Sequence, residues 1–159
     1  MDQKIELTEL DIQQSFPLLK NDHIFKITSK ATPRYNCIAW AYYYDDRWMQ
    51  YNANSMYLDG VNYWWPDGVS QTPYLESYIE AFSKRGFSIC DSYAHEEGYL
   101  KIALYEDKQH YCTHAAREKG DGVWTSKLGR SNDIIHESPY TIEGNAYGRV
   151  ACIMKRRAD

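Results

Sequence analysis

The sequence predicts an α+β domain in which a helical first half packs against an antiparallel sheet. Two patterns and the chain length support this prediction. Apolar residues recur at helical spacing over 75–82, whereas apolar and polar residues alternate through much of 98–156. A chain of 159 residues is typical of one domain and can bury a substantial core. We therefore expect a single domain over residues 1–159.

Residues 1–34 are expected to form an N-terminal arm that packs on the domain. A short amphipathic stretch covers 7–16, and the segment HIFKIT at 23–28 has the composition of a strand. Thr32 and Pro33 form a turn signal at the end of the arm.

The helical half, residues 35–90, begins where the composition changes to the run NCIAWAYYY. Asn36 is a favourable N-cap residue, so Cys37 is expected in the first turn of a helix. Residues 45–71 are rich in Trp, Tyr, Asn and Asp and contain the turn motif WWPDG, which predicts a loop with aromatic anchors.

A second helix is expected after Thr72. Thr72 suits the N-cap, Pro73 suits the first helical position, and Gly86 can close the helix. The apolar stripe of this helix consists of Leu75, Tyr78, Ile79 and Phe82.

The sheet, residues 98–156, is expected to contain five segments with strand periodicity. These are 99–106, 109–117, 122–128, 133–136 and 147–155. The run KGDG at 119–122 predicts a hairpin, and a second turn is expected over 145–148.

Charge and hydropathy exclude several classes of partner. The balance of 18 basic against 22 acidic residues gives a net charge of −4, which argues against a broad cationic surface for nucleic acid. No apolar run approaches the roughly 20 residues that span a bilayer, and the opening MDQKIELTEL lacks a secretory pattern. We expect no nucleic-acid or membrane partner and a cytoplasmic location, with export without a classical signal as the alternative. The sequence leaves the oligomeric state open.

The cysteines lie far apart and show no C-x-x-C spacing, which indicates neither a zinc ribbon nor a disulfide scaffold. They are Cys37, Cys90, Cys112 and Cys152. Free thiols are therefore expected, and we predict no cofactor and no metal.

Cys37 and His114 are the candidate catalytic pair. A cysteine in the first turn of a helix experiences the positive end of the helix dipole, which favours the thiolate. A histidine on a neighbouring strand can accept the thiol proton, and His114 lies in the alternating run HYCTH at 110–114. Alternation would place His110, Cys112 and His114 on one face of the sheet.

A third residue is needed to orient the imidazole. If the strands pair symmetrically about Gly120, Ser126 lies opposite His114, and a shift of one residue brings Lys127 there instead. Ser126 is the candidate that we prefer, with Asn132 and Asp133 as further alternatives.

The order of these features resembles the papain-like cysteine hydrolase superfamily. A helix-initial cysteine is followed by a helical segment, a strand-borne histidine, a hairpin and a strand that ends in the run SKLG at 126–129. Papain-type peptidases carry an Asn-Ser-Trp-Gly segment at the similar place. The segments YNCIAWA, WWPDG, THAAR and WTSKLG are also similar to those of an uncharacterised family of small bacterial proteins. The compact size resembles the NlpC-type and CHAP-type cell-wall amidases.

This resemblance covers roughly residues 32–155 and implies a papain-like fold with thiol-dependent acyl transfer. The substrate would be an amide bond in a peptide or in peptidoglycan, with Cys37 as nucleophile and His114 as base. Ser126 stands where the papain-type enzymes have Asn, and their preceding Gln and CGSCW context are absent. The backbone N–H of Cys37 is therefore the one oxyanion donor that we name.

Aromatic residues make up 15% of the chain, and their polar groups need partners such as a polar-lined cleft would supply. Trp64, Trp65 and Asn36 are the candidate substrate-binding residues. The same aromatic segment, 48–65, supports an alternative function as a non-catalytic papain-like binding module for a peptide, glycan or protein. A secreted antibacterial effector is another alternative.

A metal site is a further interpretation of the histidines. His110, Cys112 and His114 would supply three ligands from one strand, and Cys37 or His136 would supply a fourth. Positions at this spacing are a weak signal, so we keep the catalytic interpretation.

Overall fold

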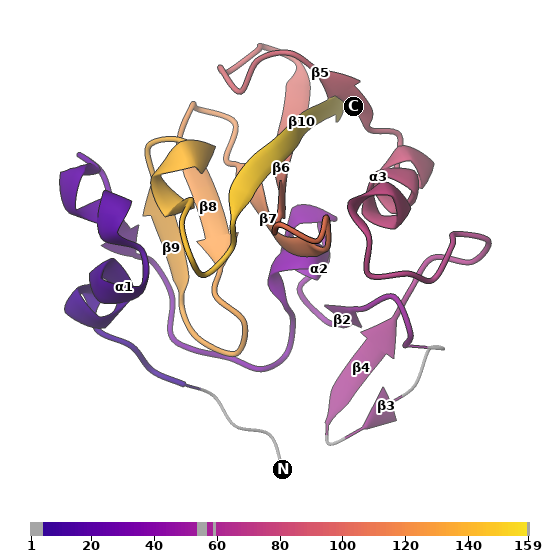
Figure 1. Cartoon of the computed structure of the whole chain (residues 1–159), viewed down its shortest axis with the longest axis horizontal. Coiled ribbons are helices and arrows are strands. Elements are labelled where there is room, and N and C mark those ends of the chain that lie inside the picture. Colours follow the sequence, from indigo (N-terminus) through magenta and orange to yellow (C-terminus); the bar gives the residue numbers. More distant parts are fainter. Residues whose placement is uncertain (1–4, 54–56, 59, 159) are drawn as a thin grey trace.

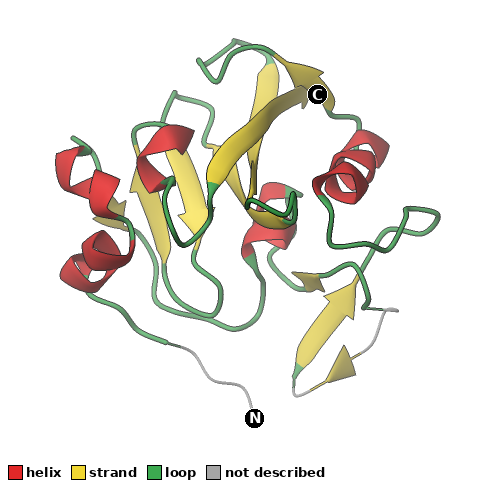
Figure 2. Ribbon diagram, viewed as in Figure 1, coloured by secondary structure: helices red, strands yellow, loops and turns green. Residues whose placement is uncertain are grey.

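A seven-stranded antiparallel sheet is the centre of the molecule (Figures 1 and 2). The computed structural model describes residues 5–53, 57, 58 and 60–158. The strand order is β1-β9-β8-β7-β6-β10-β5. The bounds are β1 Lys26–Ile27, β5 Ser88–Cys90, β6 Tyr99–Glu106, β7 Cys112–Glu118, β8 Trp124–Lys127, β9 Asp133–His136 and β10 Arg149–Arg157. The prediction of a mixed α and β protein with an antiparallel sheet is confirmed.

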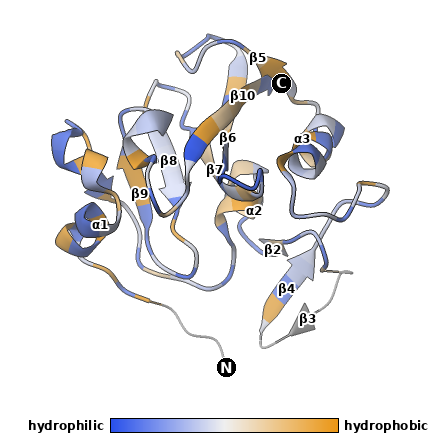
Figure 3. Ribbon diagram, in the orientation of Figure 1, coloured by the Kyte–Doolittle hydropathy of each residue, from blue (hydrophilic) through white to orange (hydrophobic). Residues whose placement is uncertain are grey.

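Helices cover both faces of this sheet. The α-helices are α1 Glu9–Ser15, α2 Cys37–Ala41 and α3 Leu75–Lys84, and the 3₁₀ helices are η1 Pro17–Asn21 and η2 Pro139–Ile142. Figure 1 shows α1 and α3 at opposite sides of the sheet, with α2 near its middle. Helix α2 is largely hydrophobic in Figure 3, as a helix packed against a sheet should be.

Two hydrophobic clusters fill the space between helices and sheet. The α2–α3 core includes Ile38 and Phe82 of the helices and Leu104, Ala115 and Met154 of the sheet. The α1 core, on the other face, includes Ile12, Leu19, Tyr105, Ala116, Trp124 and Ile134. Neighbouring residues Ala115 and Ala116 of β7 belong to different cores because successive side chains of a strand point to opposite faces.

The segment 45–71 is not simply a loop, which corrects the prediction. It carries β2 Trp48–Met49, β3 Tyr57–Leu58 and β4 Val61–Trp64, which form a second sheet in the order β2-β4-β3. Residues 54–56 and 59 of the aromatic segment lie outside the described residues. The region predicted as a helical half, 35–90, therefore contains strands as well as helices.

Helix α3 begins later than predicted, with Tyr74 rather than Thr72 as its N-cap. The backbone before the helix is held by the sheet instead, because Cys112 N–H donates to the Pro73 carbonyl (2.9 Å) and Tyr74 forms a bridge with Tyr111. A contact distant in sequence thus overrides the local helix signal of Pro73.

Strands β6 and β9 span the predicted residues. Strand β8 is shorter at both ends than the predicted segment 122–128, and β7 and β10 each begin later in the sequence than predicted. Strand β7 starts at Cys112 because the Asp107 carboxylate accepts from Gln109 N–H (2.9 Å) and Tyr111 N–H (3.0 Å), which extends the turn. Strand β10 starts at Arg149 because Gly144 and Gly148 exchange two backbone hydrogen bonds.

The β7–β8 hairpin has a different register from the predicted one. The strands pair at Arg117–Thr125 and Glu118–Trp124, and beyond these two pairs they separate. The Glu118 carboxylate accepts from Gly122 N–H (2.7 Å), which widens the loop. Ser126 is therefore not paired with His114, and the assumed symmetry about Gly120 is wrong.

Among the described residues, none of the helices combines the length and the apolar character that spanning a bilayer requires.

Candidate functional site

Asn36 and Cys37 begin helix α2 as predicted. The Asn36 Oδ1 atom accepts from the backbone N–H groups of Ala39 (3.0 Å) and Met49 (3.1 Å), and its Nδ2 donates to the Met49 carbonyl (3.0 Å). Asn36 thus caps the helix and ties it to β2. Because these bonds occupy its amide and the residue is buried, Asn36 is structural, which corrects its assignment as a substrate-binding residue.

The sulfur of Cys37 lies beside β7 and β8. Burial raises the pKa of the thiol above its usual value, while the backbone N–H groups of Ala115 and Ile38 and the charge of Lys127 act in the opposite direction. Burial is the larger effect. The helix position therefore does not make Cys37 a thiolate at rest, contrary to the simple dipole argument.

His114 belongs to a buried chain of three side chains. Its Nε2 lies 3.0 Å from the Ser126 Oγ, and that oxygen lies 2.9 Å from Nε2 of His136. His136 Nδ1 donates to the carbonyl oxygen of Ser138 (2.7 Å), which can only accept. His136 Nε2 must then accept from Ser126, so the Ser126 oxygen in turn accepts from the Nε2–H of His114.

This order leaves Nδ1 of His114 as the unprotonated ring nitrogen, and it has no hydrogen-bond partner among the described residues. Tyr147 stacks on the ring with centroids 4.0 Å apart, and Tyr105 meets it edge-on at 5.2 Å. Burial, and secondarily the charge of His136, hold the pKa of His114 well below its usual value. The imidazole is therefore neutral and keeps a lone pair on Nδ1.

His114 and Ser126 are brought together, whereas Cys37 and His114 are not hydrogen-bonded to each other in the described structure. Cys37 packs against the α2–α3 core, and the ring of His114 contacts Tyr105 and Tyr147 of the α1 core. The sulfur nevertheless lies by the N–H of Ala115, the next residue along β7. Burial raises the pKa of Tyr147, with a smaller contribution from Cys37.

His110, Cys112 and His114 do not share one face, which corrects the prediction from alternation. Cys112 pairs with Glu106 while His114 pairs with Tyr105, so one residue of β7 bulges out between them. Cys112 packs on the α2–α3 core, and His110 precedes the strand with a φ of 66°. Among the described residues, no three His, Cys, Asp or Glu side chains converge to hold a metal.

The alternative orienting residues have other partners. The Lys127 amine is buried and donates to the carbonyls of Thr32 (2.8 Å), Ser131 (2.9 Å) and Gly129. Burial lowers its pKa to about 8.

Asn132 and Asp133 likewise bond away from His114. Asn132 donates to Glu6 (3.0 Å) and to the Ser29 carbonyl (2.9 Å), and Asp133 accepts from the Tyr35 hydroxyl (2.8 Å). His136, the far member of the chain through Ser126, was not predicted as an orienting residue.

Trp65 is a core residue, which corrects its assignment to a substrate groove. It is 4% exposed, donates to the Val69 carbonyl (3.3 Å) and packs edge-on against Tyr78. Trp64 is half-buried and contacts the rings of Tyr42 and Tyr44.

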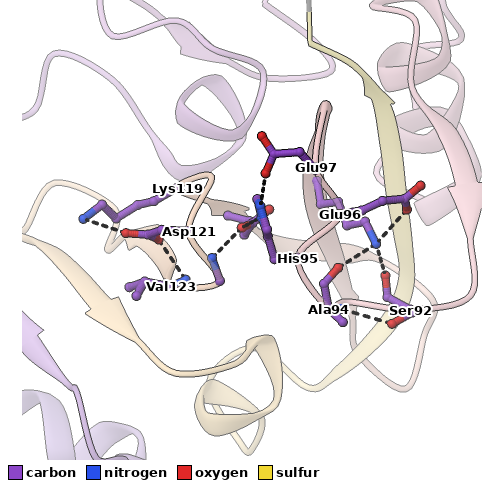
Figure 4. Close-up of polar contacts among 11 residues, drawn as sticks. Ser92, Ala94, His95, Glu96, Glu97, Lys119, Asp121 and Val123 are labelled. Carbon is purple, nitrogen blue, oxygen red and sulfur yellow. Dashed lines mark hydrogen bonds and ion pairs between the residues drawn. The ribbon is translucent and has the colours of Figure 1, made fainter.

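A second polar cluster joins the loop before β6 to the β7–β8 hairpin (Figure 4). His95 Nδ1 lies 2.8 Å from the Glu118 carboxylate, whose side chain is fully buried, and its Nε2 lies 3.4 Å from Glu97. Hydrogen bonds to these carboxylates raise the pKa of His95. Nearby, the Lys101 amine donates to the carbonyls of Ser92 and Ala94, both at 2.8 Å.

Fold and site together describe a mixed α and β protein with a buried histidine–serine–histidine chain on the α1 side of the sheet and a helix-initial cysteine on the α2–α3 side. The family model described as "Domain of unknown function (DUF7689)" matches residues 26–155, and the chain belongs to this family. The comparisons with curated proteins and with solved structures give no match.

Proposed function

We propose that this protein is a thiol-dependent acyl-transfer enzyme, a cysteine peptidase or amidase acting on a peptide or peptidoglycan amide bond. Cys37 is the nucleophile, His114 the base and Ser126 the residue that orients the base. The free Nδ1 of His114 is the observation that supports this best. A buried ring nitrogen with no partner is costly, and such groups are common where a proton must be accepted.

The reaction starts from a neutral thiol and a neutral imidazole. The thiol proton passes to Nδ1 of His114 as the sulfur attacks the substrate carbonyl, and the backbone N–H of Cys37 stabilises the oxyanion. The amine leaves with the proton from Nδ1, and water or an amine then cleaves the thioester. Cys37 packs on the α2–α3 core, the His114 ring lies on the α1 core, and no hydrogen bond joins them among the described residues. This proton transfer therefore requires helix α2 and strand β7 to rearrange when substrate binds.

Ser126 fixes the imidazole through Nε2 and leaves the other nitrogen for chemistry. The serine hydroxyl is itself fixed by His136, so the two histidines act through one oxygen. In this proposal Ser126 and His136 are positioning residues, because neither touches the substrate.

A non-catalytic binding module is the second candidate. It is supported by the lack of a thiol–imidazole hydrogen bond in the described structure and by a half-buried aromatic group beside α2. In that group the Arg47 guanidinium lies 3.8 Å from the Tyr44 ring and 5.2 Å from the Trp64 ring, a combination common in contact surfaces.

Labelling with a peptide that carries a thiol-directed electrophile tests the proposal. We expect the reagent to modify Cys37 selectively, and His114→Gln to slow the modification by at least about 100-fold, as loss of a general base does. Mass spectrometry of digested protein measures the rate at each cysteine, and Cys90→Ala is the control that should leave the rate at Cys37 unchanged. The rate should rise with pH because the pKa of the Cys37 thiol is raised by burial.

Equal rates in the wild type and His114→Gln would overturn the enzymatic proposal and favour the binding module. Circular dichroism of each variant verifies folding. Cys37→Ser, which keeps the size of the side chain, supplies a folded protein without the nucleophile.

A further inference from the structure

A cleft of about 400 Å³ lies between the outer end of the sheet and helix α2, apart from the buried ring of His114. Charged and polar side chains line it on several sides. They include Ser29, Trp40, Arg117, Lys119, Thr125 and Asp133. The charged side chains of the cleft are the cations Arg117 and Lys119 and the anion Asp133, and Lys119 also pairs with Asp121 (3.8 Å).

Arg117 is fixed in this cleft by two aromatic rings. Its guanidinium carbon lies 3.9 Å from the centre of the Trp40 ring and 4.1 Å from that of Tyr43. One N–H donates to the Trp40 carbonyl (2.9 Å), and no ion pair with a carboxylate is present among the described residues. A guanidinium held flat in this way has further donors in a fixed plane, which suits a carboxylate.

Asp133 supplies the opposite charge at the same cleft. Its Oδ2 accepts from the Tyr35 hydroxyl (2.8 Å), while its buried Oδ1 has no hydrogen-bond partner within the described part of the chain. The Ser29 hydroxyl donates to the carbonyl of Lys30 (3.3 Å) and accepts from the backbone N–H of Asp133 (3.2 Å). Burial raises the pKa of Asp133, and the Tyr35 and Ser29 hydroxyls act in the opposite direction. Asp133 and Arg117 form no ion pair with each other in the described structure, so each has capacity for a ligand.

We propose that this cleft binds the carboxy-terminal residue of a peptide, with the α-carboxylate on Arg117 and the adjacent amide N–H on Asp133. A phosphate group fits less well, because it carries more negative charge next to Asp133 and brings no N–H for Oδ1. The site is independent of the thiol chemistry at Cys37. It is a binding site on the outer end of the sheet that recognises a free chain end.

Calorimetric titration of the full chain with three probes tests this site. The probes are an N-acetylated dipeptide with a free carboxylate, the matching carboxamide, and inorganic phosphate. We expect the carboxylate peptide to bind at least about tenfold more tightly than either of the others, since a charge-assisted bidentate contact is lost in the carboxamide. Arg117→Met and Asp133→Asn should each lower the affinity for the carboxylate peptide by about tenfold.

Arg130→Met is the matched control, because Arg130 also stacks on an aromatic ring, 5.5 Å from that of Trp48, but does not line this cleft. It should bind as the wild type does. Equal affinity for the peptide and its carboxamide overturns the proposal, as does equal affinity for phosphate, which would indicate anion attraction alone. These two comparisons use the wild type and hold even where a variant fails to fold. If the peptide does not bind as expected, the labelling test of Cys37 still stands. If Cys37 is not labelled as expected, the peptide-binding test still stands.

Discussion

Hydrogen bonds join the side chains of His114, Ser126 and His136, and only one assignment of donors and acceptors fits all three. The carbonyl of Ser138 fixes the proton on Nδ1 of His136, and the Ser126 hydroxyl passes that constraint to His114. A second proton on either histidine would place a charge in this buried site, and on His136 it would also remove the acceptor on which the order depends. Burial therefore lowers the pKa of His136 to about 4 and that of His114 well below its usual value.

The histidines should accordingly titrate in a set sequence. On acidification we expect His95 to become charged first, because hydrogen bonds to Glu118 and Glu97 raise its pKa. His136, with a pKa lowered to about 4, should remain neutral down to about pH 5 with its proton on Nδ1. His114 should titrate well below its usual range, with its proton on Nε2. Long-range ¹H–¹⁵N spectra of the imidazoles measure both the tautomer and the titration.

Ser126→Ala is the informative variant for this network. Without the hydroxyl, neither Nε2 atom has its partner, so the fixed tautomer of His114 should be lost while His95 titrates as before. A wild-type His136 that titrates near its usual value of about 6.5 would contradict the buried network.

At the residue scale, local signals predicted the cap and the cysteine but not the full site. Asn36 and Cys37 follow from a pattern within a few residues, and that prediction is confirmed. Ser126 contacts His114 although the assumed register is wrong, because the side chains meet across the separated strands. Pairing the run WTSK with DIIH would have drawn attention to His136, which the structure places opposite Trp124.

The turn into β10 depends on one glycine. Gly148 has a φ of 77°, and a Cβ at this position would overlap the carbonyl oxygen of Glu106. It directly follows Tyr147, whose ring covers His114. The close approach of this turn to β6 therefore places the aromatic cover over the imidazole.

Gly148→Ala should destabilise the protein strongly, by at least about 3 kcal/mol, because backbone strain and overlap with backbone atoms add together. Gly120→Ala is the control. Gly120 has a φ of 102°, and the Cβ that alanine would add there lies within 4 Å of no atom. Its substitution therefore introduces backbone strain without overlap and should lower the free energy of unfolding by about 1 kcal/mol. Urea denaturation measures both free energies of unfolding, and equal losses would show that the overlap is relieved by a small shift.

At the element scale, periodicity predicted long elements and missed short ones. Strand β6 follows from eight residues of strand composition, whereas β2 and β3 have two residues each and leave no detectable period. The late start of α3 depends on a hydrogen bond from Cys112 to Pro73, which no local pattern reports. Side-chain caps in the loop after β7 likewise moved the hairpin register.

The stability of the whole molecule should fall as the pH falls from neutral to about 4. In the unfolded chain His136 binds its proton near pH 6.5, but in the folded protein only near its lowered pKa of about 4. Unfolding therefore takes up a proton between these values, and the unfolded state gains about 3 kcal/mol relative to the folded state by pH 4. His114 acts in the same direction.

The raised pKa of His95 has the opposite effect on stability. Its contribution to stability is present at low pH and is lost as the pH rises through the pKa of His95 in the folded protein. Comparison of the wild type with His136→Gln isolates the His136 contribution. Urea unfolding at several pH values measures the free energy of unfolding, which should fall less on acidification in the variant than in the wild type. Parallel pH profiles for the two proteins would refute the assignment.

At the scale of the whole molecule, the sequence predicted a mixed α and β protein with an antiparallel sheet, but not how the chain closes that sheet. The N-terminal arm contributes β1, which pairs with β9 at one edge, and β10 lies between β6 and β5. Hydropathy identifies strands but not their neighbours, because pairing depends on contacts between residues far apart in the chain.

The interior position of β10 has a consequence for biosynthesis. Strand β6 emerges from the ribosome well before the partner that covers its second edge, and β5 waits for the same partner. Throughout that interval the nascent polypeptide has unpaired strand edges, which can form hydrogen bonds with the strands of other chains. A delay in the synthesis of β10 would lengthen the interval in which such association can occur.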